Sequence, residues 1–249
     1  MCRERNTQYG IRNTRYVTRI AYCVFRVLLV LLAALALAAV GLLWWFSVDL
    51  PSPDRLGTYI ADSTGIESHT FVPLSDIAEP LRWATIATED KDFYNRSWDI
   101  HPSAVLRAIW TTLRNPNAMD SYTIPQRLVA NLMTLSGKRV SSPVRQRLRE
   151  LALTVWLTYH YTPDRILELY LNSIPYGPSL YGVESAALFY YGKHASDLSL
   201  AECVMLVAIA QEPDGDLEFA RRRQAIVLDL MVEEGYITPE EAARAKIVH

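Results

Sequence analysis

The longest unbroken run of apolar positions lies near the start of the chain. Residues 27–47, VLLVLLAALALAAVGLLWWFS, contain no charged side chain, and about 20 apolar residues in a helix cross the hydrocarbon core of a bilayer. Arginines precede the run and Trp44 and Trp45 close it, which predicts a membrane anchor with its N-terminal side in the cytoplasm. A cleaved signal peptide is the alternative, but its apolar region usually has about 7–15 residues, so we expect an uncleaved anchor.

Beyond residue 72, apolar positions recur at helical spacing, and the alternation typical of strands is nearly missing. A Ser-Pro pair at 142–143 predicts the start of the longest helix of this region. One apolar face of that helix is expected to be buried, with Glu150 at its edge, and its residues are Val144, Leu148, Leu151 and Val155. We therefore predict an all-α domain in this part of the chain.

Proline, glycine and capping residues divide the rest of the chain into shorter segments. Residues 48–72 are predicted to form a short stalk, because prolines and a Ser-Thr-Gly sequence interrupt regular structure there. We expect one helix that ends near Asp90, a second that carries Arg107 and a third that runs from Pro125 to Gly137. A fourth helix is expected to begin at Thr162, a fifth to cover 183–193, and a sixth to begin at a capping box formed by Ser199 and Glu202. The last two are expected to end at Gly235 and to begin at Thr238.

Charge is distributed unevenly along the chain. The formal net charge is −2, but residues 1–26 hold six arginines and one glutamate, a net charge of +5, which leaves −7 for the remainder. A basic head before an acidic body argues against nucleic-acid binding and favours a chain oriented in a membrane. The three cysteines and five histidines have no metal-ligand spacing, and Cys203 is expected to be a small buried hydrophobic residue.

Two carboxylates stand out as candidates for chemistry. The first is Glu89, which ends a predicted helix together with Asp90 and is followed by Phe93 and Tyr94. A carboxylate desolvated by aromatic neighbours has a raised pKa, as a general base requires, although a solvated helix end would have the same sequence. A second carboxylate, Glu150, lies in a helix rich in arginine, and this pairing favours a catalytic site.

Four segments, read in order, resemble the motifs of glycosyltransferase family 51, the peptidoglycan glycosyltransferases. They are TEDKDFY at 88–94, TIPQRLVANL at 123–132, RQRLREL at 145–151, and ILELYLN at 166–172 with YGVESAALFYYGK at 181–193. The resemblance covers about residues 73–213. It implies a lysozyme-like helical fold behind one transmembrane helix, and polymerisation of lipid II into β-1,4-linked glycan strands outside the cytoplasmic membrane.

The same resemblance assigns roles to residues of this chain. It implies that Glu89 is the general base and that Glu150 is the second carboxylate, acting at the leaving pyrophosphate. The predicted substrate-binding residues are Asp90, Phe93, Thr123, Gln126, Arg127, Asn131, Lys138, Arg139, Arg145 and Arg147. The basic members of this set could hold phosphates, the arginines by bidentate contact, and the alternative is that they form a solvated helix face.

The chain departs from the family pattern at several positions. Residues 95–98, Asn-Arg-Ser-Trp, stand where the first motif has His and Gly. The second motif lacks both of its glycines, and Arg127 replaces a glutamine, Pro125 a threonine, and Ala130 a lysine that contacts substrate phosphate. We therefore consider that Arg127 or Lys138 supplies the missing charge. A weakened relative that binds lipid II as a scaffold, and a lysozyme-like glycoside hydrolase, are the alternative functions.

The remaining expectations concern domains, cofactors and partners. We divide the chain into a cytoplasmic head (1–26), the anchor (27–47), the stalk (48–72) and the glycosyltransferase domain (73–249). No dedicated metal site is expected, but the resemblance allows a divalent cation, Mg²⁺ or Mn²⁺, and cell-wall synthesis proteins as partners. Since no Ser-x-x-Lys sequence occurs, no transpeptidase function is expected. Glu168 and Glu184 are expected to be paired structural charges.

Overall fold

The computed structural model describes residues 22, 25–27, 29–34, 37, 41, 51–55, 58–59, 70–96, 98, 102–114, 122–213 and 217–247. The chain divides into two compact units, Met1–Val48 and Asp49–His249. The described residues of the first unit are helical. Most of the predicted anchor lies outside the described residues, and among those that are described no helix is long and apolar enough to cross a membrane.

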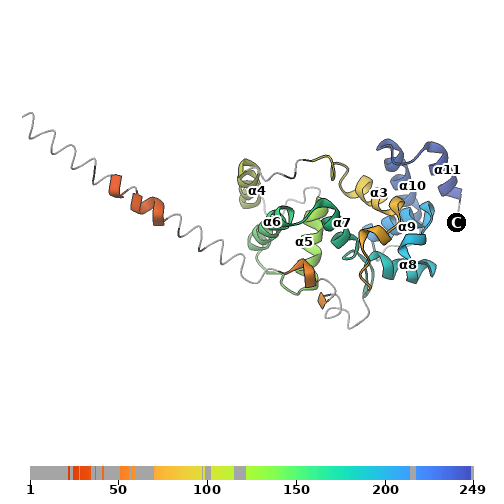
Figure 1. The fold of residues 1–249 in the computed structure, drawn as a ribbon, viewed down its shortest axis with the longest axis horizontal. Helices are drawn as coiled ribbons and strands as arrows, with labels where there is room; N and C mark the ends of the chain where they lie inside the picture. The colour runs from red at the N-terminus through yellow and green to blue at the C-terminus, as the bar shows by residue number, and fades with distance from the viewer. Residues whose placement is uncertain are drawn as a thin grey trace, which may run out of the picture. The chain divides into compact units, whose positions relative to one another are not determined.

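The second unit is built mainly from helices, in agreement with the prediction of a helical domain (Figure 1). Its elements are η1 (Pro53–Arg55), η2 (Leu74–Asp76), α3 (Glu79–Glu89), α4 (Pro102–Arg114), α5 (Ile124–Leu135), α6 (Pro143–His160), α7 (Pro163–Leu171), β1 (Pro175–Gly177), β2 (Leu180–Tyr181), α8 (Val183–Tyr191), η3 (Ala195–Asp197), α9 (Leu200–Gln211), α10 (Leu217–Glu233) and α11 (Pro239–Ile247). The antiparallel pair β1–β2 departs from a purely helical fold.

Local capping interactions set the helix starts that the sequence predicts. The Thr162 hydroxyl accepts the Arg165 N–H at 3.3 Å where α7 begins. The N–H of Ser199 donates to the Glu202 carboxylate at 2.8 Å in the capping box of α9. Such caps satisfy backbone N–H groups that have no partner inside the helix. After α5, Gly137 has φ of +65°, a conformation that favours glycine and ends the helix.

Two hydrophobic clusters form the core of this unit, and α3 and α9 contribute to both. The larger cluster joins them to α5, α6, α7, α8 and the β1–β2 hairpin. The smaller one joins them to α10 and α11. Cys203 on α9 is fully buried in the larger cluster, as predicted. Near the C-terminal end of α3, Ile86 belongs to the larger cluster and Ala87 to the smaller one, and the helix packs against α9 and α10 (Figure 1).

The buried face of α6 differs from the predicted one. The expected apolar positions are only half-buried, and the buried residues are Gln146, Arg149, Glu150, Leu153 and Leu157. Three of these five are polar, so hydrophobicity alone indicated the wrong face. Burial of such groups is tolerated where they interact with one another, and Gln146 donates to Glu150 at 2.8 Å. Glu150 therefore lies within the buried face of α6.

Part of the predicted stalk packs directly on α7. The Asn172 side chain bonds both backbone groups of Val72, accepting its N–H at 3.0 Å and donating to its carbonyl at 2.9 Å. The Glu168 carboxylate accepts the Leu74 N–H at 2.8 Å and pairs with Arg165. The prediction that Glu168 is a paired structural charge is confirmed. These contacts explain why the third and seventh residues of the motif ILELYLN, Glu168 and Asn172, are polar.

Candidate active site

Glu89 is the last residue of α3, and its carboxylate is close to an arginine of α5. Arg127 Nε lies 2.5 Å from Glu89 Oε2, and the side chains are 44% and 9% exposed respectively. Among the described residues, none gives Oε2 a hydrogen bond of ordinary geometry, so the contact is an ion pair. Arg127 replaces the glutamine of the family motif, and in the structure its charge faces the predicted base.

The surroundings of Glu89 favour its protonated form. Burial raises the pKa of the Glu89 carboxyl above its ordinary value, and the charges of Arg127 and Arg223 oppose that rise only in part. Two buried phenols, Tyr170 and Tyr176, have their own pKa raised by burial and, to a smaller extent, by the Glu89 charge. A carboxylate with a raised pKa is a stronger base than a solvated one, as proton abstraction requires.

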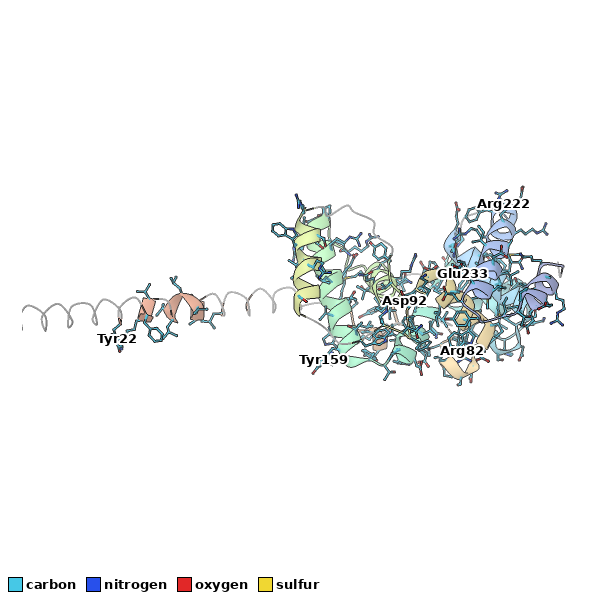
Figure 2. The ribbon with its side chains drawn as sticks, turned by 90° about the horizontal axis from the view of Figure 1, so that it is seen from above. Tyr22, Arg82, Asp92, Tyr159, Arg222 and Glu233 are labelled. Carbon is cyan, nitrogen blue, oxygen red and sulfur yellow. The ribbon has the colours of Figure 1, made fainter. Side chains whose placement is uncertain are left out.

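Asp90 connects the end of α3 to the start of α5. One carboxylate oxygen accepts the Ile124 N–H at 3.1 Å, and the other pairs with Arg96 in the turn that contains Asp92, labelled in Figure 2. Burial raises the pKa of the Asp90 carboxyl, and Arg96 opposes this. The described contacts of Asp90 are therefore those of a helix cap and an internal ion pair, although the resemblance implied a substrate contact.

Polar residues of the second motif also bond within the protein. The Gln126 amide oxygen accepts the Thr123 N–H at 3.0 Å across the first turn of α5. The Asn131 amide donates to the Ser173 hydroxyl at 3.1 Å and so ties α5 to the segment after α7. These bonds fix the position of α5, which carries Arg127 in its first turn.

Glu150 is held by neighbours from its own helix. One oxygen accepts Gln146 Nε2 at 2.8 Å, and the other lies 3.2 Å from Arg147 Nη1. Gln146 also accepts the Val140 N–H at 3.0 Å, so it fixes both the carboxylate and the segment before α6. The Arg147 guanidinium lies 4.7 Å from the centre of the Tyr122 ring, within the range of a cation–π interaction.

Both predicted catalytic carboxylates border the start of α5. Glu89 reaches it through Arg127, and Glu150 reaches it through Arg147, whose guanidinium covers the Tyr122 ring. Helix α5 packs against α6, so two acids that are 61 positions apart in the sequence are each linked through an arginine to residues at or just before the start of α5. Their arrangement around this segment defines the candidate active site.

The predicted basic cluster is only partly a solvated surface. Arg149 is buried and lies on the same face of α6 as Glu150. Lys138 and Arg145 are half-buried and both interact with other groups, whereas Arg139 is exposed. The alternative of a wholly solvated helix face is therefore wrong for this cluster.

One predicted substrate contact is wrong, and two site residues were missed. Phe93 is 0% exposed and packs in the core against Tyr94 and Trp98, so it presents no surface to a ligand. Arg223 of α10 was not predicted, because only tertiary packing brings its charge to Glu89. Gln146 was missed because a polar residue on a helix is expected to face solvent. Its spacing of four residues from Glu150, which places the two side chains next to each other on a helix, could have indicated the contact.

Comparison with known proteins identifies the family of this chain. The chain matches the transglycosylase family over residues 57–232 and therefore belongs to that family. Penicillin-binding protein 1A of Aquifex aeolicus (strain VF5) is 36% identical over 187 residues, or 73% of this chain and 25% of that protein. The Neisseria gonorrhoeae protein of that name is 32% identical over 239 residues, or 90% and 29%. That of Rickettsia bellii (strain RML369-C) is 29% identical over 242 residues, or 86% and 30%.

These matches confirm the resemblance drawn from the four motifs. The chain spans 25% to 30% of the length of these curated relatives. Membership of the family defines the chain as a transglycosylase, an enzyme of glycosyl transfer.

Proposed function

We propose that this transglycosylase polymerises lipid II into β-1,4-linked glycan strands, with Glu89 as general base and Glu150 as the second carboxylate. The observation that supports this most is that each acid pairs with an arginine near the start of α5: Glu89 with Arg127 in its first turn, and Glu150 with Arg147, which contacts Tyr122 just before it. The first and second motifs are thus joined by the Arg127–Glu89 pair, and the third motif contacts Tyr122 through Arg147. The names of the relatives, penicillin-binding proteins, support a role in the cell wall.

The proposed reaction is a displacement with inversion at the donor sugar. The 4-hydroxyl oxygen of the acceptor forms a bond to C1 of the donor while its proton passes to the Glu89 carboxylate. The bond between C1 and the α-linked diphosphate oxygen breaks, and the diphosphate leaves with the electron pair. The product has a β-1,4 linkage, and the proton taken by Glu89 is later released to solvent.

The two carboxylates are suited to different roles by their surroundings. Burial raises the pKa of Glu89, which makes its ionised form a better proton acceptor. Glu150 is bonded by Gln146 and Arg147, so it can orient a guanidinium toward the departing diphosphate, to which arginine binds well. Among the described residues no group of three His, Cys, Asp or Glu side chains is placed to hold a metal.

The proposal includes the location of the enzyme. Residues 27–47 anchor the chain in the cytoplasmic membrane with the catalytic unit outside, and the basic head favours this orientation. An anchored enzyme remains beside a substrate whose polyprenyl tail stays in the bilayer. Growing glycan and other cell-wall synthesis proteins are the proposed partners.

Labelled lipid II tests this function directly. The full chain in detergent is expected to produce glycan polymer, and Glu89→Gln and Glu150→Gln are each expected to lose activity, Glu89→Gln by about 100-fold or more. Glu218→Gln, at a side chain 80% exposed on α10, is the matched control and should retain activity. Absence of polymer from the wild type, or cleavage of finished glycan instead, would overturn the proposal.

One observation favours the second candidate, a lipid-II-binding scaffold. Arg127 pairs with Glu89, and a guanidinium held permanently against a base would suppress proton abstraction. A scaffold would bind lipid II and produce no polymer at any protein concentration. Binding measured beside polymerisation therefore separates the two candidates.

A further inference from the structure

Arg127 and Glu89 form a pair whose two members differ greatly in accessibility. The Arg127 side chain is 44% exposed, whereas that of Glu89 is 9% exposed. An anion arriving from solvent can reach the guanidinium without displacing the core around Glu89. Arg127 is also in the first turn of α5, where its N–H bonds the Thr123 carbonyl at 2.9 Å, and the positive end of a helix dipole favours anions there.

The contact between the two side chains is not the strongest that they could make. It joins Arg127 Nε to Glu89 Oε2, and among the described residues none satisfies that oxygen with a hydrogen bond of ordinary geometry. A bidentate contact to a carboxylate or phosphate has two aligned N–H bonds and is stronger. A diphosphate therefore offers the guanidinium a partner that can compete with Glu89.

A second arginine would remain near Glu89 if Arg127 moved away. Arg223 on α10 bonds the Gln211 side chain, and its charge lowers the pKa of Glu89. The other ionisable groups that affect Glu89 or are affected by it are Asp90 on its own segment, Tyr170 on α7 and Tyr176 on β1. Departure of Arg127 would raise the pKa of Glu89 further, but Arg223 would still provide a positive charge near the carboxylate.

From these contacts we propose that Arg127 is an exchangeable counter-ion of the base. It pairs with Glu89 in the free protein and transfers its guanidinium to the diphosphate of the bound substrate, which releases Glu89 to accept a proton. The inference rests on the proposed function for the identity of the substrate. It explains how a chain with arginine at this position of the second motif retains a usable base.

Inorganic pyrophosphate is the probe that tests the exchange without turnover. Its affinity is measured by titration calorimetry for the full chain, for Glu89→Gln, for Arg127→Gln and for the double variant. Loss of the competing carboxylate should tighten binding by roughly 5- to 10-fold, the size of a typical coupling between two sites. Arg127→Gln should weaken binding, and Arg222→Gln, at a side chain 62% exposed on α10, labelled in Figure 2, is the charge-matched control.

The double variant separates exchange from simple charge repulsion. If Arg127 is released by Glu89→Gln, the gain in affinity must disappear when Arg127 is also replaced. A gain that persists in the Arg127→Gln background would show that the carboxylate only repels the anion, and would overturn the proposal. An unchanged affinity in Arg127→Gln would overturn it as well. Retention of wild-type affinity by Arg127→Lys would support a requirement for positive charge.

Polymerisation gives a second readout once the wild type is shown to be active. Removal of a positive neighbour raises the pKa of Glu89, so the acidic limb of kcat/KM in Arg127→Gln should move to higher pH, because the base must be ionised in the free enzyme. An unchanged acidic limb would contradict the pairing. If the wild type makes no glycan, the proposed function fails, while the four pyrophosphate affinities still decide whether the exchange occurs.

Discussion

Replacement of Asp90 by alanine tests whether this motif residue holds the fold or contacts substrate. The change removes the cap on the Ile124 N–H, a loss of about 1 kcal/mol, and the ion pair with Arg96, a hydrogen bond to a charged group contributing about 1.5–3 kcal/mol. Burial raises the pKa of Asp90, so its charge has a desolvation cost that the variant no longer has. We therefore expect a net loss of about 2 kcal/mol in the free energy of unfolding.

Urea unfolding followed by circular dichroism measures this loss. For a unit of this size, about 2 kcal/mol corresponds to a fall in Tm of roughly 4–8 °C. Asp90→Asn is the matched variant, because asparagine also caps helices well, and it should lose less than half as much. Wild-type stability in Asp90→Ala, together with a selective rise in KM for lipid II, would show that Asp90 contacts substrate and that the structural reasoning is wrong.

Three further predictions concern stability and pH. In Glu89→Gln, the fall in unfolding free energy as pH rises from about 4.5 should be smaller than in the wild type. The reason is that the raised pKa of Glu89 makes the folded protein bind its proton more tightly than the unfolded chain does. Urea titrations at several pH values check this. Asn172→Ala leaves both backbone groups of Val72 without their partner and should cost about 2–4 kcal/mol in the same assay. The hydrogen bond to Glu184 raises the pKa of His194. The contribution of this bond to the unfolding free energy is therefore complete below pH 6.5 and is lost as pH rises through the raised pKa. His194→Gln should remove this part of the pH dependence in the same assay.

The helix boundaries were predictable because they depend on short-range chemistry. A hydroxyl or carboxylate satisfies backbone N–H groups three residues away, as Ser199 and Glu202 do, and glycine adopts the positive φ that ends a helix, as Gly137 does. These interactions involve only residues that are neighbours in the sequence and can therefore be predicted from it. The same holds for Glu202, whose predicted role as a helix cap is confirmed.

The orientation of α6 and the full surroundings of Glu89 were not predictable in this way. An apolar stripe indicates a buried face only where polar residues stay outside, and on α6 Gln146 and Glu150 bond each other on the inner face. Arg223 approaches Glu89 from a helix that begins 128 positions after it, at Leu217. The role of Arg127 also needed coordinates, because the motif indicated a substrate contact where the structure shows an ion pair.

The most direct measurement is the rate of lipid II polymerisation for wild type, Glu89→Gln, Glu150→Gln and the double variant. If both acids serve one reaction at the start of α5, their losses are not multiplicative, because removal of either already disables the same step. We predict that the double variant is about as slow as the slower single variant. Multiplication of the two losses, or full activity in Glu150→Gln, would contradict a shared active site.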